Sequence, residues 1–372
     1  MTNRAEAIRP DANTLIEEIE KVGLQTPKIL TLMITDACNL SCPHCLLNCK
    51  GRNTLPVSPK KIINIMDEFS ELGGQVLLIT GGEPLCHPDL PDILDHACRI
   101  TSLSEVILQT NGVMINTEYI EKVKSLNPEK LKIQVSLDGA TPEINDIIRG
   151  KGSFEASVKG IKLLADAGMG RRVIIAFTEM KHNFEQIPQM LKLADSLGVG
   201  RFTAGTLVKG GRAKKIDWIK LPDKYQIRGL IGLYDSDPVF KALYDKLGNI
   251  SAIEWYKGRD IPSDHVCNCI STPFINAAGK MFPCVMNLDD ELAVDNVHEE
   301  GLKKSIIKGL EKWTCLPRLD RERSESLAKC RSCAGREHCR GGCIGRAQAG
   351  NGDAMTVEDR CELRREVYYW KR

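Results

Sequence analysis

Three cysteines within eight residues are the first feature of this sequence that could do chemistry. Cys38, Cys42 and Cys45 have the spacing C-x3-C-x2-C, and Cys49 follows with three residues between. Structural zinc sites usually take four ligands from paired C-x2-C units, whereas thiolates also hold iron–sulfur clusters. A four-iron cluster held by three thiolates leaves one iron open, as a catalytic metal keeps an open coordination position. Half of a zinc site is the alternative interpretation.

Cysteine is frequent throughout the chain, which has fifteen cysteines in 372 residues, nine of them between Cys267 and Cys361. Residues 1–23 are charged throughout and lack the apolar core of a secretory signal. No run reaches about 18 uninterrupted apolar residues, so we expect no membrane span. These features predict a cytoplasmic protein with reduced thiols. Metal or cluster ligation is then a better interpretation of the cysteines than a disulfide scaffold.

The overall composition is that of an ordinary globular protein, with 42% hydrophobic and 27% charged residues. The formal net charge of +2 gives no reason to expect a nucleic acid or another polyanionic partner. A chain of this length can bury a hydrophobic core without stabilising disulfides, so the cysteines are available for metal or cluster ligation.

Six apolar segments alternate with amphipathic helical patterns between residues 28 and 208. Because these segments are rich in Ile, Val, Leu and Thr and are continuous rather than strictly alternating, they predict buried parallel strands. The predicted strands are residues 28–35, 75–80, 104–110, 130–138, 171–180 and 201–208.

The intervening patterns predict helices over residues 58–74, 153–168 and 183–198. In the first, Ser58 is a candidate cap, Pro59 lies in the first turn, and two glycines end the helix. Its expected buried face is Ile62, Ile63, Met66 and Phe69. In the third, Pro188 is expected to shorten the helix.

Six strand–helix units in series predict parallel strands joined by crossovers. The predicted fold class is α/β, a partial (β/α)6 TIM-like barrel followed by a small Cys-rich domain with a short β-hairpin and helices; an open doubly wound sheet is the alternative. In both, functional residues gather at the carboxyl ends of the strands. The predicted divisions are a helical extension (1–27), the barrel (28–215), a helical connection (216–266) and the Cys-rich domain (267–372).

The cysteine loop after the first predicted strand resembles that of the radical S-adenosylmethionine (SAM) family. The resemblance implies that Cys38, Cys42 and Cys45 hold a [4Fe–4S] cluster whose open iron binds SAM. It also implies reductive cleavage of SAM to a 5′-deoxyadenosyl radical, which takes a hydrogen atom from substrate. We expect Cys49 and His44 to pack beside the cluster without ligating it.

Short motifs at the following strand ends extend this resemblance. Two adjacent glycines after the second strand allow a close approach to the backbone, and the segment is similar to the GGEP motif of the family. An arginine further along suits a carboxylate because its guanidinium is bidentate. Ordinary βα turns and an arginine that caps a loop are the alternatives. The SAM contacts that the resemblance implies are Gly81, Gly82, Glu83, Pro84, Thr110, Asn111, Ser136, Asp138 and Arg149.

The C-terminal cysteines form a second pattern. Nine residues separate Cys269 from Gly279 and four separate Gly279 from Cys284; a C-x2-C-x5-C-x3-C run and a last cysteine follow. The pattern resembles the SPASM domain, which implies two auxiliary [4Fe–4S] clusters and hence three clusters in all. One would be held by Cys269, Cys284, Cys343 and Cys267, and the other by Cys330, Cys333, Cys339 and Cys361. A four-thiolate zinc site in the C-x2-C-x5-C-x3-C run is the alternative, but it leaves the other cysteines unexplained.

The resemblance limits the reaction without naming a substrate. SPASM enzymes often modify ribosomal peptides, and others act on small sugar-type natural products by oxidation, epimerisation or dehydration. Sulfatase-maturing relatives carry Asp where Val285 stands, which disfavours that activity. About 27 residues precede the first strand, so we expect a peptide-recognition domain, if one is needed, on a separate partner. Flavodoxin or ferredoxin is the expected electron donor.

Two further hypotheses concern single features. If Cys267 is not a cluster ligand, it could return a hydrogen atom to the substrate radical, as a free cysteine does in epimerising relatives. A non-catalytic iron–sulfur electron carrier is the alternative of another class, which would not need the glycine and glutamate motif at Gly81 to Glu83. Cys86, Cys98 and Cys315 are expected to be small core or loop residues.

Overall fold

The computed structural model describes residues 11–49, 51, 55–262, 267 and 270–371. In this part of the chain, nine strands form one curved sheet in the order β7-β6-β5-β4-β3-β2-β1-β8-β9. The first six strands pair in parallel with their sequence neighbours. Their bounds are β1 (Ile29–Met33), β2 (Val76–Thr80), β3 (Glu105–Thr110), β4 (Leu131–Ser136), β5 (Val173–Glu179) and β6 (Arg201–Thr206).

Burial alternates along these strands, so the expectation of continuously buried strands is wrong in detail. In β3, Val106, Leu108 and Thr110 are buried, whereas the residues between them are only half-buried. The half-buried face lines the interior of the open barrel and tolerates polar groups, such as Gln109, which donates to Gln134 at 2.8 Å. The apolar face packs against the outer helices. The barrel therefore has an interior that can accept a polar ligand.

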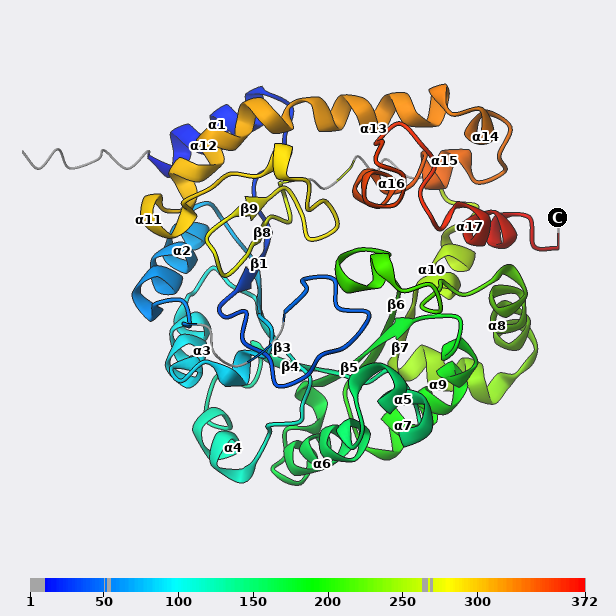
Figure 1. Ribbon diagram of the computed structural model, residues 1–372, viewed down its shortest axis with the longest axis horizontal. Helices are drawn as coiled ribbons and strands as arrows, with labels where there is room; N and C mark the ends of the chain where they lie inside the picture. The colour runs from blue at the N-terminus through cyan, green and yellow to red at the C-terminus, as the bar shows by residue number, and fades with distance from the viewer. Residues whose placement is uncertain (1–10, 50, 52–54, 263–266, 268–269, 372) are drawn as a thin grey trace, which may run out of the picture.

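Helices cover the outer face of the six strands (Figure 1). In α2 the buried face includes Ile65 in place of the predicted Ile63, and Ser58 makes no capping hydrogen bond. Pro188 lies in the first turn of α7, because a short 3-10 turn replaces the start of the predicted helix. The outer helices are α2 (Pro59–Glu71), α3 (Leu90–Arg99), α4 (Thr117–Val123), α5 (Pro142–Arg149), α6 (Ser153–Asp166) and α7 (Ile187–Ser196).

The sheet continues beyond the six predicted strands at both edges. At one edge β7 (Gly248–Ile250) pairs in parallel with β6, among the helices α8 (Lys224–Ser236), α9 (Pro238–Leu247) and α10 (Ser251–Gly258). At the other edge β8 (Phe274–Ile275) pairs in parallel with β1 and forms a hairpin with β9 (Met281–Phe282). The C-terminal hairpin is therefore joined to the barrel by backbone hydrogen bonds.

Short helices make up the rest of the C-terminal region, which lies along one side of the barrel (Figure 1). The region is anchored on α2, where Glu68 accepts from the backbone of Lys303 at 2.9 Å. The N-terminal α1 (Ala12–Lys21) contacts α12. The C-terminal helices are α11 (Val297–Glu300), α12 (Leu302–Trp313), α13 (Cys315–Ser326), α14 (Ala328–Arg331), α15 (Arg336–Cys339), α16 (Ile344–Asn351) and α17 (Cys361–Tyr368). The 3-10 helices are η1 (Pro84–Cys86), η2 (Gly170–Arg172), η3 (Phe184–Gln186), η4 (Gly211–Lys215) and η5 (Asp290–Leu292).

Candidate active site

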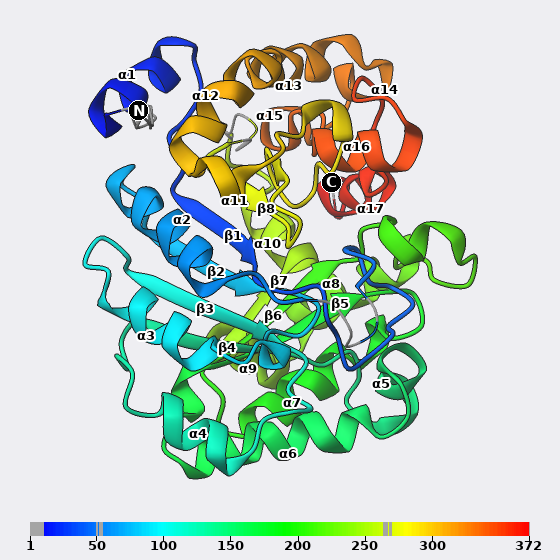
Figure 2. The same ribbon diagram turned by 60° about the vertical axis from the view of Figure 1, so that its left-hand side comes forward.

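The cysteine loop follows β1 and lies beyond the carboxyl ends of the strands (Figure 2). Its backbone is fixed locally: Cys38 donates to the carbonyl of Gly51 at 2.7 Å, and Cys45 donates to that of Cys42 at 3.2 Å. Cys38, Cys42 and Cys45 are all half-buried. Burial raises the pKa of the Cys38 thiol to about 11, so a bound cation is needed to favour its thiolate.

The two glycines after β2 pack directly under this loop. A Cβ at Gly82 would lie 2.3 Å from the carbonyl oxygen of Ala37, and one at Gly81 would lie 2.6 Å from that of Thr35. The close packing permits two backbone hydrogen bonds, from Gly82 to Thr35 at 2.7 Å and from Glu83 to Ala37 at 2.8 Å. In these contacts the glycines bring β2 against the cysteine loop, which the sequence argument, based on a ligand's approach, did not anticipate.

Glu83 is fully buried and joins two strand ends. Its carboxylate accepts from the hydroxyl of Thr110 and from the backbone of Asn111, both at 2.7 Å, and from the backbone of Leu85 at 3.1 Å. Burial raises the pKa of Glu83, while these donors oppose the shift. Asn111 in turn donates to Asn39 of the cysteine loop at 2.7 Å. Glu83 therefore positions the residues around the site, and its side chain does not line the cavity described below.

A buried ion pair joins the fourth strand end to α5. Arg149 lies 2.8 Å from Asp138, with side-chain exposures of 9% and 0%. The other oxygen of Asp138 accepts from the backbone of Thr178 at 2.7 Å. Burial is the largest influence and disfavours the charge of Arg149, but Asp138 together with the thiols of Cys42 and Cys45 raises the arginine pKa. Asp138 thus holds Arg149 at the cavity wall instead of lining the wall itself.

His44 shares this carboxylate from within the cysteine loop. Its Nε2 lies 3.3 Å from Asp138, and burial lowers the histidine pKa to about 4, so the ring is neutral at pH 7. A neutral imidazole has one nitrogen that donates and one that accepts. Among the described residues, neither Nδ1 of His44 nor Nε of Arg149 has a hydrogen-bond partner, although both are buried. Two such orphaned atoms fit a polar ligand with both donors and acceptors.

The cysteine loop and the strand ends enclose one cavity of about 480 Å³. Cys38, Cys42 and Cys45 line it together with polar groups from β2 to β6. Of the predicted SAM contacts, the structure brings together here Gly82, Thr110, Asn111, Ser136 and Arg149. Three thiols on one wall and hydrogen-bonding groups on the other fit a thiolate-held cluster with a polar ligand.

Cys49 lies beside Cys45, as expected of a residue that packs near the cluster. It is buried, and its thiol donates to the carbonyl of Leu47 at 3.7 Å. Its interaction with Cys45 lowers the pKa of Cys45 and raises that of Cys49. Cys49 does not line the cavity. Its contact therefore favours the thiolate of a neighbouring cysteine.

The C-terminal cysteines line two other cavities. Cys267, Cys284 and Cys343 line one of about 490 Å³, whereas Cys269 lies outside the described residues. Cys330, Cys333, Cys339 and Cys361 line a small enclosed cavity, with Cys339 reaching both. Within the described part of the chain, no three His, Cys, Asp or Glu side chains converge closely enough to hold a single metal ion.

Two apolar residues separate the first cavity from the C-terminal one. Val285 and Met286 follow the hairpin and line both cavities. Cys267, the candidate hydrogen-atom donor, lines the C-terminal cavity and not the one beside Cys38, and its backbone donates to Asp320 at 2.9 Å. The structure thus places Cys267 with Cys284 and Cys343.

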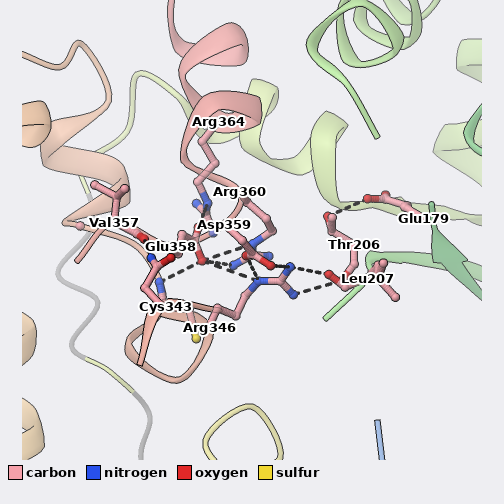
Figure 3. A network of polar contacts seen from close by, with 12 residues as sticks. Glu179, Thr206, Leu207, Cys343, Arg346, Val357, Glu358, Asp359, Arg360 and Arg364 are labelled. Atoms are coloured by element: carbon pink, nitrogen blue, oxygen red, sulfur yellow. Dashed lines mark hydrogen bonds and ion pairs between the residues drawn. The ribbon is translucent and has the colours of Figure 1, made fainter. Parts of the chain in front are cut away.

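A buried polar network connects the C-terminal cysteines to the barrel (Figure 3). Arg346, about 1% exposed at its side chain, forms two bonds to Asp359 at 2.7 and 2.9 Å and donates to the carbonyls of Thr206 and Leu207 at the end of β6. Glu358 accepts from the backbone of Cys343 at 3.1 Å. No local motif predicted the contacts of Arg346 with the barrel, because Thr206 and Leu207 lie far from it in the sequence.

Opposed charges hold Glu358 ionised in this network. Burial alone would raise its pKa, but Arg364 at 2.7 Å and Arg360 at 2.8 Å lower the pKa to about 2.

The remaining cysteines lie apart from the three cavities: Cys98 is buried in the core, and Cys86 and Cys315 are half-buried. Over the described residues, no helix has both the length and the apolarity that crossing a membrane requires.

Known proteins resemble this chain in sequence and in fold. Residues 32–194 match the model of the radical SAM superfamily. Mycofactocin maturase MftC of Mycobacterium ulcerans is 31% identical over 345 residues, which cover 89% of this chain and 86% of that protein. AdoMet-dependent heme synthase of Methanosarcina barkeri is 27% identical over 91% of this chain and 97% of its own. Streptococcus suis SuiB bound to its precursor peptide SuiA has a TM-score of 0.72 at 19% identity, covering 93% of this chain and 78% of that one.

A partial α/β barrel with a three-cysteine loop over its strand ends defines an enzyme of the radical SAM class. The chain belongs to the radical SAM superfamily, and its Cys-rich C-terminal region is of the SPASM type. Membership implies SAM and one [4Fe–4S] cluster as cofactors. The predicted fold class is confirmed.

Proposed function

We propose that this enzyme cleaves SAM reductively at a [4Fe–4S] cluster held by Cys38, Cys42 and Cys45, and modifies a ribosomally made peptide. The observation that supports this most strongly is the cavity that these three cysteines share with the strand ends of the barrel. When bound, the cluster and SAM supply a 5′-deoxyadenosyl radical, a chemistry that belongs to the cofactor.

The residues of this chain would bind and orient SAM. Arg149 is the candidate partner of its carboxylate, since its guanidinium lines the cavity and keeps Nε unpaired among the described atoms. Thr110, Asn111 and Ser136 offer hydroxyl and amide groups on the same wall. Glu83 would act through Thr110 and Asn111, whose positions it fixes.

A peptide substrate is proposed from the relatives. MftC is a maturase, SuiB binds the precursor peptide SuiA, and the subtilosin biosynthesis protein AlbA is 33% identical over 191 residues. Apolar side chains of Leu207 and Val208, which follow β6, and of Val285, which follows β9, also line the cavity. A hydrophobic peptide side chain would fit beside them.

Two auxiliary [4Fe–4S] clusters complete the proposal, in a domain of residues 267–372. Cys330, Cys333, Cys339 and Cys361 would hold one, since they line one cavity. Cys284, Cys343 and Cys267 would hold the other with Cys269. A flavodoxin or ferredoxin would supply the electron.

A second candidate function is a step in heme synthesis, because the resemblance to AdoMet-dependent heme synthase spans 97% of that relative.

Anaerobic reconstitution with iron and sulfide tests the proposal. With dithionite and SAM we expect 5′-deoxyadenosine from the wild type and none from Cys42→Ala. Peptides encoded beside the gene, prepared with deuterium, should transfer the label to 5′-deoxyadenosine. A cluster-loaded wild type that leaves SAM intact would refute the enzyme, whereas label transfer from a porphyrin and not from peptides would favour the second candidate.

A further inference from the structure

Arg212 contacts the cysteine loop from the far side of the barrel, where no site residue was predicted. It lies in η4, the next element after β6 along the chain, and it is half-buried. Its Nε donates to the carbonyl of Cys42 at 2.8 Å and its Nη1 to that of Cys49 at 2.5 Å. Its backbone nitrogen donates to the carbonyl of Cys45 at 3.0 Å. One residue therefore holds three points of the loop that carries the candidate ligands.

The residues around Arg212 permit this close approach. Gly211 has a φ of +52°, and a Cβ there would lie 2.3 Å from the carbonyl oxygens of both Cys45 and Leu46. On the other side of the turn, the Nζ of Lys209 donates to the carbonyls of Ala213 at 3.0 Å and Ile216 at 2.8 Å. A side chain at position 211 would push the backbone away from the cysteine loop.

The charge of Arg212 has no counter-ion among the described side chains. Arg149, the other arginine of the cavity, pairs with Asp138 at 2.8 Å. Arg212 makes no ion pair with a described carboxylate, and its side-chain hydrogen bonds go to neutral carbonyls. A half-buried cation of this kind favours a nearby anion.

We propose that Arg212 is a positioning residue that fixes the cysteine loop and is also the counter-charge of the cluster held there, so that it raises the cluster's reduction potential. The inference rests on the proposed function, because it takes Cys38, Cys42 and Cys45 as the ligands. One-electron reduction, by an external donor, adds a negative charge to the cluster, and a nearby cation stabilises the reduced form.

Three variants separate the two parts of this role. Arg212→Gln removes the charge and the fork of donors, and Arg212→Lys keeps the charge but loses the fork. Arg99→Gln, at a side chain 78% exposed on α3, makes the same change in net charge as a control. Each protein is reconstituted anaerobically under the same conditions, and its iron content is measured. The midpoint potential is measured by redox titration of the EPR signal that changes on addition of SAM, which singles out this cluster.

The expected results differ between the variants. Arg212→Gln should shift the midpoint potential to more negative values, while Arg212→Lys and Arg99→Gln stay near the wild type. Both Arg212 variants should release iron to a chelator severalfold faster than Arg99→Gln, because the cysteine loop has lost the guanidinium hydrogen bonds to the carbonyls of Cys42 and Cys49. If Arg212→Gln takes up less iron than Arg212→Lys while both remain folded by circular dichroism, the requirement for the charge is supported.

Other results would overturn the inference. A wild-type midpoint potential in cluster-loaded Arg212→Gln would exclude the role of Arg212 as counter-charge. Wild-type rates of iron release from both Arg212 variants would exclude its role in positioning the cysteine loop. If the EPR signals of the cluster-loaded wild type do not change on addition of SAM, the proposed function is overturned, and the inference with it. The two failures are thus distinguished by the wild-type spectrum alone.

Discussion

The two cysteine-bearing regions of this molecule are built in opposite ways. The loop of Cys38, Cys42 and Cys45 lies on a continuous parallel sheet and is held by backbone and side-chain bonds from β2 and from the turn after β6. The C-terminal cysteines lie on short helices and loops, and α14 and α15 have only four residues each. Their surroundings are held by ion pairs around Arg346 and Glu358.

The difference indicates where metal is needed for folding. One continuous hydrophobic core joins the sheet and its outer helices with residues of α12, α13, α16 and α17, whereas α14 and α15 contribute none of its buried residues. We expect the first site, which lies on this core, to form before any cluster binds. Helices of one turn are not stable alone, so we expect α14 and α15 to depend on cross-links such as metal ligation. We infer that cofactor binding completes the first site and organises the second.

Removal of iron should give the largest effect. We expect limited proteolysis of the chelated protein to cleave within α14 to α17 while the β1–β6 barrel stays protected, because that region loses its thiolate cross-links. Mass spectrometry of the fragments and hydrogen exchange would locate the change. Equal protection of both regions with and without iron would contradict the contrast drawn here.

Arg346→Ala should destabilise the contact between the two regions by about 3–5 kcal/mol, as removal of one partner leaves a buried charge unpaired. Its two bonds to Asp359 and its donors to Thr206 and Leu207 would be lost. Chemical unfolding of the cluster-loaded enzyme measures this, with the exposed Arg331→Ala as control. Similar stabilities for the two variants would show that the network contributes little.

Glu179→Gln should alter the pH dependence of stability. Burial raises the pKa of Glu179 to about 7, so the folded state binds more protons than the unfolded state, whose carboxyl titrates near 4.5. Wild-type stability should therefore fall as pH rises from about 4.5 through about 7, by at most about 3 kcal/mol. The amide of the variant keeps an acceptor for Thr206 and never ionises, so its curve should be flatter. Melting temperatures at pH 5.5 and 8.5, with exposed Glu129→Gln as control, test the sign.

Cys49→Ala should have the smallest effect. Cys49 contacts Cys45 but does not line the cavity, so we expect the variant to keep its iron and most of its SAM cleavage. The loss of one small buried side chain should cost about 1 kcal/mol. Iron analysis and a 5′-deoxyadenosine assay check this beside Cys45→Ala, which should lose both. Equal loss in the two variants would make Cys49 a ligand.

The sequence predicted the elements that depend on local pattern. All six barrel strands lie within the predicted ranges, because β-branched runs between helical patterns are a local signal. The glycines after β2 were noticed, but their packing on Thr35 and Ala37 was not, since a contact between two strand ends is not visible in either segment. Arg212 and the contacts of Arg346 with the barrel were missed for the same reason: these partners are backbone carbonyls more than a hundred residues away in the sequence.

The most direct test of this account uses the triple variant Cys38→Ala, Cys42→Ala, Cys45→Ala after anaerobic reconstitution. Its iron is measured by iron analysis and Mössbauer spectroscopy, and its SAM cleavage by formation of 5′-deoxyadenosine. If the two regions bind clusters independently, the variant should lose about a third of its iron and all 5′-deoxyadenosine formation, while the C-terminal region stays protected from proteolysis. Loss of all the iron, or SAM cleavage that survives, would contradict it.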